Sequence, residues 1–216
     1  TNGIQITNIN DNYNLIGNPY PSAIDAEEFL AANTYHATTN PTGVIYGNVK
    51  LWTHGYQPAA IVNPFYGSFA YNYNANDYVT LNYLGASDPI GASNIIKSGQ
   101  AFFVQMVDGT TGTGNVNFSN SMRLDASNNP YNNSGFFRNS NTPLERHRIW
   151  LDLIDSNNIV SGTLVGYATD ATYGFDTFFD AQAAVPGFMK IYSLIGNDVY
   201  DIQGRSLPFD QNDQVP

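Results

Sequence analysis

Short runs of apolar and β-branched residues, separated by Gly, Asn and Pro, recur along the whole chain. Runs of this length and composition are typical of β-strands bounded by turns. Alternation over residues 49–53 predicts a half-buried strand, whereas the nearly continuous apolar run 101–107 predicts a strand covered on both faces. The other strands are expected at residues 12–16, 43–53, 78–84, 114–118, 146–154, 163–168, 189–194 and 199–202.

One helix is expected, over residues 23–32. Ser22 and Asp25 have the spacing of a capping box, with Asp in place of Glu, and Pro21 lies just before them. The residues that follow are good helix formers, and Asn33 is a suitable stop. The sequence therefore predicts an all-β protein with a single short helix.

A turn-rich, apolar-poor stretch at residues 125–143 divides the strand-rich parts of the chain. We expect a boundary near Pro143 and two β-sandwich units of jelly-roll or immunoglobulin-like type, residues 1–142 and 143–216. The second unit has fewer strand candidates than the roughly seven of a complete sandwich. We therefore expect it to be truncated, with its missing strands beyond Pro216 or supplied by a partner. The apolar face of Ile149, Leu151 and Leu153 would then be partly uncovered.

The charge of the chain argues against several classes of partner. Its formal net charge is −10 at pH 7, only 12% of its residues are charged, and no basic patch is present. Nucleic acid and anionic membranes are therefore not expected as partners. No apolar run approaches the ~20 residues of a membrane span, so direct membrane insertion is not expected either. The absence of cysteine suits an exported bacterial protein and equally many cytosolic ones.

The sequence offers no catalytic residues. His36, His54 and His147 lie far apart without the spacing of a zinc site, and neither a nucleophile elbow nor a phosphate-binding loop occurs. Acidic side chains near the start of the expected helix, Glu27 and Glu28 among them, are better explained by the helix dipole. We therefore expect the chain not to be an enzyme.

A group of aspartates after the expected strand 163–168 is the candidate metal site. Calcium takes six to eight oxygen ligands, which loops supply readily, and Asp170, Asp176 and Asp180 lie in one such loop. Their spacing is not that of an EF-hand, and the alternative is that each carboxylate caps nearby backbone amides. If a metal binds, we expect it to be Ca²⁺ at these three residues.

A loop that interleaves aromatic residues with Asn, between residues 63 and 83, is the candidate ligand site. Flat aromatic rings together with amide and carboxylate groups suit a sugar, which offers apolar ring faces and hydroxyl rims. The alternative is that Tyr and Asn simply populate an extracellular β surface. The residues expected to bind the ligand are Tyr66, Tyr71, Tyr73, Asn74, Asp77 and Tyr78.

One segment, Asn14-Leu-Ile-Gly-Asn-Pro-Tyr-Pro-Ser-Ala-Ile-Asp25, resembles a segment of very large exported proteins of the Bacteroidetes, among them adhesins and other cargo of the type IX secretion system. Residues 98–104, 118–123, 148–153 and 166–180 extend the resemblance over most of the chain. Tyr13 stands where that family often has Trp. The resemblance implies no active-site residues. It implies export through the type IX machinery as part of a parent protein, upstream of a C-terminal sorting domain, to the cell surface or the extracellular space.

These observations predict a non-catalytic structural or adhesive region of a large secreted bacterial surface protein. The alternative is a carbohydrate-binding module of a secreted multidomain enzyme, with surface polysaccharide as the ligand. An independent hydrolase is the third possibility. An accessible line of aromatic side chains would favour the second, and a cleft with facing carboxylates the third.

Overall fold

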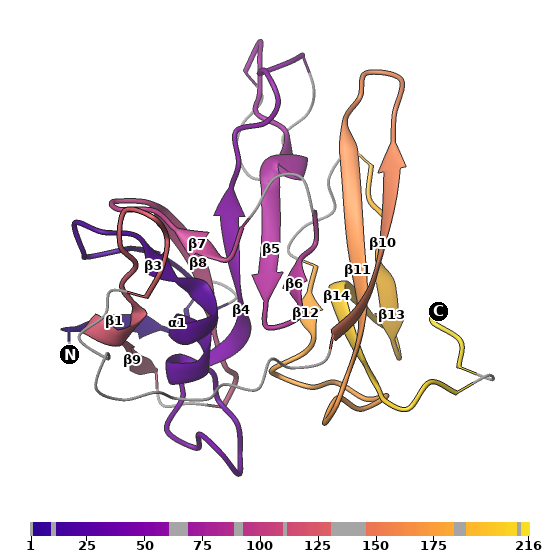
Figure 1. Cartoon of the computed structure of the whole chain (residues 1–216). Coiled ribbons are helices and arrows are strands. Elements are labelled where there is room, and N and C mark those ends of the chain that lie inside the picture. The colour runs from indigo at the N-terminus through magenta and orange to yellow at the C-terminus, as the bar shows by residue number, and fades with distance from the viewer. Residues whose placement is uncertain are drawn as a thin grey trace.

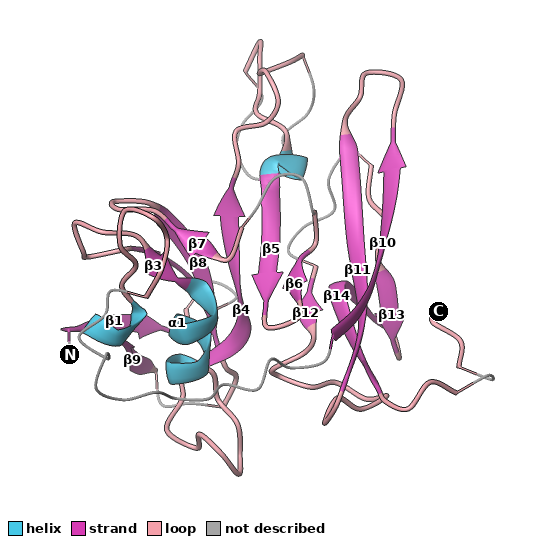
Figure 2. Ribbon diagram, in the orientation of Figure 1, coloured by secondary structure: helices cyan, strands magenta, loops and turns pink. Residues whose placement is uncertain are grey.

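The computed structural model describes residues 2–9, 12–60, 69–88, 93–109, 112–130, 146–183, 189–210 and 213–216. These residues form several mostly antiparallel sheets, one α-helix and the two short 3₁₀ turns η1 (Ala75–Asp77) and η2 (Asn120–Met122), as Figures 1 and 2 show. The all-β class expected from the sequence, with one short helix and sandwich-like units, is confirmed.

The first unit is built on a five-stranded antiparallel sheet. Its strand order is β2-β8-β4-β5-β6, and one helix, α1, packs on one of its faces. The elements are β2 (Tyr13–Gly17), β8 (Ala101–Met106), β4 (Ile45–Trp52), β5 (Tyr78–Asn82), β6 (Gly85–Ala86) and α1 (Ala26–Asn33). Two small antiparallel pairs close the unit: β1 (Asn2–Thr7) with β9 (Thr113–Phe118), and β3 (Ile24–Asp25) with β7 (Ile95–Ile96).

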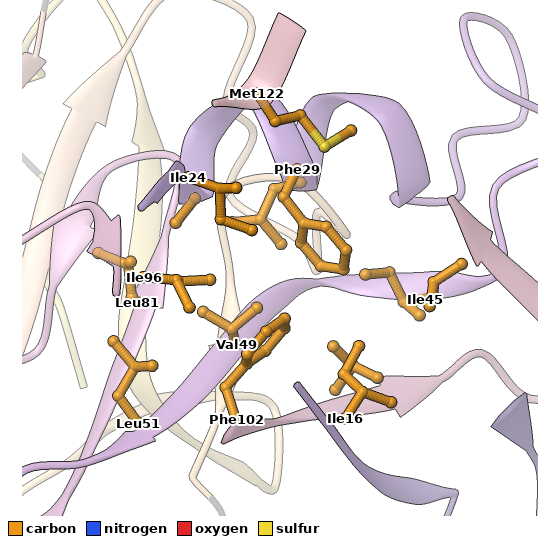
Figure 3. Close-up of a cluster of buried hydrophobic side chains, with 14 of the residues drawn as sticks. Ile16, Ile24, Phe29, Ile45, Val49, Leu51, Leu81, Ile96, Phe102 and Met122 are labelled. Atoms are coloured by element: carbon orange, nitrogen blue, oxygen red, sulfur yellow. The ribbon is translucent and has the colours of Figure 1, made fainter. Parts of the chain in front are cut away.

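The core of the first unit lies between α1 and the sheet. Phe29 of α1 is fully buried, with its ring 5.3 Å from that of Phe102 in β8 and 5.0 Å from that of Phe118 in β9. Figure 3 shows Phe29 directed from the helix towards Val49 and Phe102 of the sheet. Burial of this apolar surface is the main force that holds the helix, which is only eight residues long, on the sheet.

The second unit is a five-stranded mixed sheet on the side of the molecule away from α1 (Figure 1). Its order is β10-β11-β14-β12, with β13 also paired to β14. The β11–β14 pairing is parallel and the others are antiparallel. The strands are β10 (Arg146–Ile154), β11 (Val160–Ala168), β12 (Ala181–Gln182), β13 (Ser193–Ile195) and β14 (Asp198–Ser206).

The helix begins later than the sequence predicts, because residues 24 and 25 are held in strand β3 against β7. Its N-cap is Asp25, whose carboxylate accepts the backbone N–H of Glu27 at 2.8 Å. Ser22 is therefore not the cap, and its hydroxyl accepts Nε–H of Arg123 instead. The preceding Gly-Asn-Pro-Tyr-Pro-Ser turn is organised by the buried Asn18, whose amide donates to the carbonyls of Ser22, Ile96 and Lys97.

Two expectations about burial are also wrong. Strand β8 is not covered on both faces, since Phe102, Val104 and Met106 are buried while the residues between them are not. Strand β4 is not half-buried, because its residues from Gly47 to Leu51 are all buried. Both differences have one cause: the second unit covers part of the outer face of the sheet, over β4 and β5, and leaves β8 open.

Most of the expected boundary at residues 125–145 lies outside the described residues. Each sheet takes all its strands from one side of that stretch. The two units nevertheless pack tightly, since Leu84 of the first is fully buried in an apolar cluster with Leu164 and Ile202 of the second. The division into 1–142 and 143–216 thus stays a prediction, while the contact between the two parts is extensive.

Candidate functional site

Four aromatic side chains form a continuous row across the open part of the first sheet. We call Phe103, Tyr78, Trp52 and Tyr73 the aromatic strip. Neighbouring ring centroids along it are 5.9, 4.8 and 5.5 Å apart, in that order. His54 lies at the Tyr73 end, with its ring 5.6 Å from the Tyr73 ring.

The pleat of the strands creates this row. Val104 of β8, Leu51 of β4 and Val79 of β5 point into the core under α1, so the residue next to each points to the opposite face. Trp52 and Tyr78 are directly paired across β4 and β5, which brings their side chains together on that face.

The strip is exposed at its Tyr73 end, where Tyr73 is 41% exposed, while Trp52, Tyr78 and Phe103 are half-buried. Near its two ends, Tyr71 is 71% exposed and Leu15, paired with Phe103 across β2 and β8, is 62% exposed. Successive rings meet edge to face, at 64°, 74° and 83°. Because they are not coplanar, their faces point in different directions. Such a surface fits a twisted or branched polymer better than a flat crystalline one.

The predicted ligand residues divide into two groups. Tyr73 and Tyr78 belong to the strip, Tyr71 is exposed two residues before Tyr73 in the chain, and Tyr66 lies outside the described residues. The other two predicted ligand residues, Asn74 and Asp77, are buried and shape the loop. Asn74 accepts the N–H of Asn76, and Asp77 accepts two backbone N–H groups.

Burial of Asp77 raises the pKa of its carboxyl group, while the N–H groups of Tyr56 and Gly55, at 3.0 and 2.6 Å, oppose that rise.

The sequence did not predict Trp52 and Phe103 as members of the site, because they lie on separate strands. Side chains alternate between the two faces along a strand, and this alternation places Trp52 and Phe103 on the face opposite the core. It was the signal in the sequence that could have identified them.

The strip ends where the second unit covers the sheet, at a buried polar network. Lys50 Nζ donates to the carbonyl oxygen of Gln182 at 2.8 Å and to Thr80 Oγ1 at 3.2 Å. Thr80 in turn donates to Asp201 Oδ2 at 2.7 Å, and Lys190 Nζ lies 2.8 Å from Asp201 Oδ1. Both Lys50 and Asp201 are buried, so this network joins the two units through desolvated charges.

Desolvation lowers the pKa of Lys50 to about 8, and the positive charge of Lys190 acts in the same direction against the attraction of Asp201. A cavity beside the network, lined in part by Asn76, Ser161 and Asp201, has a volume of about 20 Å³. That is room for about one water molecule. This cavity is too small for an organic ligand, so binding there is not supported.

Two of the three predicted calcium residues, Asp176 and Asp180, use their carboxylates in backbone contacts. Asp176 accepts the N–H of Thr172 at 2.6 Å, and Asp180 accepts the N–H groups of Asp176 and Gly204 at 2.6 and 2.7 Å. Asp170 is exposed in a left-handed turn with φ of 73°. Across the described parts of the chain, no three His, Asp or Glu side chains gather as a metal site requires. The calcium site stays a prediction, and the contacts fit the capping alternative.

The carboxyl group of Asp180 is buried, and its pKa is shifted upwards. Burial raises the pKa of its carboxyl group to about 7, with a further rise from Asp176, although its two N–H donors and Arg205 favour the charged form. Its Oδ1 accepts the N–H of Gly204, which ties the loop to the C-terminal part of β14.

A family model described as a domain of unknown function, DUF8693, matches residues 1–216. The chain belongs to the DUF8693 family. No curated protein and no solved structure matches the chain. The DUF8693 description names no activity, ligand or cellular location, so the resemblance to type IX cargo stays a prediction. No helix among the described residues is long and apolar enough to span a membrane.

Proposed function

We propose that this chain is a non-catalytic adhesive region of a large exported bacterial surface protein, and that it attaches to polysaccharide through the aromatic strip. The observation that carries the proposal is the row of half-buried to exposed rings from Phe103 to Tyr73, with Tyr73 exposed at its end. Pyranose rings stack on aromatic faces through their apolar C–H surface, while neighbouring polar groups bind their hydroxyls. Several stacking faces in a row suit a polymer rather than a single sugar.

Two further features support an adhesive role. The loop that carries Tyr73 is fixed by the buried Asn72, Asn74 and Asp77, so the exposed rings pay little ordering entropy on binding. The network around Lys50 links the strip-bearing sheet rigidly to the second unit. A surface that must transmit pulling force benefits from such a link.

The setting at the cell surface rests on the resemblance of residues 14–25 to exported Bacteroidetes proteins. In this structure the motif forms a turn organised by Asn18, next to the start of α1. A structural role of this kind agrees with a family marker that contains no active-site residue. We accordingly propose export through the type IX machinery as part of the parent protein.

The absence of catalysis is part of the proposal. Two of the candidate acidic residues have structural contacts: Asp25 caps α1, and Asp155 accepts the N–H groups of Asn157 and Ile159 in a turn. A screen of glycoside, ester and peptide substrates tests this. Turnover that is lost on changing Glu27, Glu28 or Asp176 to Ala would overturn it.

A carbohydrate-binding module of a secreted enzyme would use the same aromatic strip. The two alternatives differ in the parent protein, which carries a catalytic domain in one case and further adhesive or sorting domains in the other. The neighbouring domains in the gene decide between them.

Binding to a panel of soluble polysaccharides, measured by affinity electrophoresis and calorimetry, tests the proposed contact. We expect at least one glycan to bind, and Tyr73→Ala to weaken that binding about tenfold through the lost stacking face. Tyr192→Ala is the matched control, because Tyr192 is similarly exposed, at 47%, and is not part of the strip. Equal binding by both variants, or no binding by any glycan, would contradict the proposal.

A further inference from the structure

Strand β10 is a long edge strand with an apolar outer face. Among the described residues it pairs with β11 alone, over nine residues and without a register shift. Ile149, Leu151 and Leu153 share the face that points away from the first unit, and they are 53%, 50% and 41% exposed. A long exposed apolar edge of this kind is a template for pairing with another strand.

The backbone groups of β10 that face away from β11 can be assigned from the hairpin. Asp155 donates its N–H to Ile159 across the turn, whereas Val160, the partner of Ile154, donates to Tyr56 Oη instead of to β10. Along a strand, the backbone N–H and C=O groups of successive residues point alternately towards the two neighbouring strand positions. The N–H and C=O groups of Arg148, Trp150 and Asp152 therefore point towards the free edge.

We propose that β10 pairs with β10 of a second copy of this chain, antiparallel and centred on Trp150. A twofold axis through Trp150 brings two outward-facing sets of backbone groups together, as an antiparallel ladder requires. The two five-stranded sheets then become one continuous sheet.

The charges on β10 favour an antiparallel second copy as the partner, and together with the apolar side chains they favour this register. With Trp150 opposite its own copy, Arg148 of one chain faces Asp152 of the other, and the pair occurs twice by symmetry. Arg148 and Asp152 are both exposed, so their charged groups are available to a partner. Opposite charges directly across a ladder stabilise it, and like charges destabilise it. A shift of the register by two residues in one direction loses both pairs. A shift in the other direction pairs Arg146 with Asp152 instead, but it places Leu151 opposite His147 rather than opposite Ile149.

The apolar face fits the same register. Ile149 of one copy lies opposite Leu151 of the other, at the positions between the hydrogen-bonded pairs. Side chains approach most closely at those positions. Leu153 lies opposite His147, whose ring already packs 5.0 Å from that of Phe209. The exposed apolar side chains of both copies thus merge into one stripe.

The oligomeric state of the 1–216 chain in solution tests the proposal, through sedimentation velocity over a wide concentration range. We expect a reversible dimer. Asp152→Arg places two Arg residues opposite each other and should weaken it at least tenfold. Arg148→Asp should do the same through paired aspartates. A mixture of the two variants restores both opposite-charge pairs, and we expect it to form heterodimers.

Arg148 also donates to the Leu84 carbonyl and lies over the Trp150 ring, so Arg148→Asp could perturb folding. A cross-linking experiment is independent of that variant. The chain has no cysteine of its own. Under mild oxidation, Ile149→Cys mixed with Leu151→Cys should form an intermolecular disulfide. Ile149→Cys mixed with Ile154→Cys is the matched control and should not.

Three results would overturn the proposal. One is a monomer at every concentration, and another is a dimer that neither charge variant weakens. The third comes from a longer natural version of the chain. If that version stays monomeric while the amides of Trp150 and Asp152 are protected from hydrogen exchange, the edge is covered by a strand of its own polypeptide.

Discussion

The ammonium group of Lys50, in the middle of β4, donates to the backbone carbonyl of Gln182 in β12, 2.8 Å away. This contact joins the outer face of the first sheet directly to the second unit. It places a cation in a buried interface, where Asp201 is the balancing charge at 3.9 Å. The free energy of unfolding should therefore fall by different amounts when Lys50 or Asp201 is replaced.

Asp201→Ala should destabilise the protein by about 3–5 kcal/mol, because it leaves Lys50 buried without an opposing charge. Lys50→Met should cost much less, since Asp201 keeps its contact with Lys190 and the methionine fills a similar volume. Urea unfolding of the two variants and the parent chain measures this difference. Equal losses for both would contradict the assigned asymmetry.

The pKa of Asp180 predicts a pH-dependent stability. It is about 7 in the folded protein, above the ordinary value of 3.8. The folded state therefore binds the proton more tightly. The stability from this group is fully present below about pH 4 and is lost as the pH rises through 7.

Asp180→Asn removes the titration. The advantage of the parent chain over this variant should shrink between pH 4 and pH 8, by about 4 kcal/mol at most. Unfolding free energies of both proteins across this range are the measurement. A difference that stays constant with pH would show that Asp180 titrates in its ordinary range.

Gly47 marks a place where the two units approach too closely for a side chain. A Cβ atom there would lie 2.1 Å from the carbonyl oxygen of Thr177, which also accepts the Gly47 N–H. Gly47→Ala should therefore cost about 1–3 kcal/mol through forced separation of the backbones. In the control Gly174→Ala, the nearest atom lies 3.8 Å away, and thermal melts should change little.

The aspartate loop provides a test of metal binding. Since Asp176 and Asp180 already accept backbone N–H groups, we expect the melting temperature to be the same in millimolar Ca²⁺ and in chelator. A cation that binds only the folded state would raise it. A calcium-dependent rise that disappears in Asp176→Ala would establish the predicted site and contradict the capping explanation.

The sequence allowed the strands to be predicted where local composition dominates. The run 146–154 coincides with β10, and the runs 12–16 and 101–107 are β2 and β8 to within about a residue at each end. Strand β1 was missed although Ile4 and Ile6 alternate, because its pairing partner β9 lies over a hundred residues away. Tertiary pairing also moved the helix start, since β7 holds residues 24 and 25 extended.

The candidate site was harder to predict, because neighbouring aromatic side chains come from different strands. Tyr71, Tyr73 and Tyr78 are close in sequence and were identified together. Trp52 and Phe103 join them only through the register of β4, β5 and β8. The burial of Asn74 and Asp77 follows from contacts inside the loop, which composition does not reveal.

The buried Lys50 also limits how this protein can evolve by recombination. Domains that fold independently can be exchanged between genes, because each keeps a solvent-compatible surface in a new protein. A gene segment that carried β4 to a new protein without β12 and β14 would expose a lysine selected for a dry setting. It would also leave Asp201 behind in the donor. The two halves are therefore expected to be inherited together, as one unit of descent.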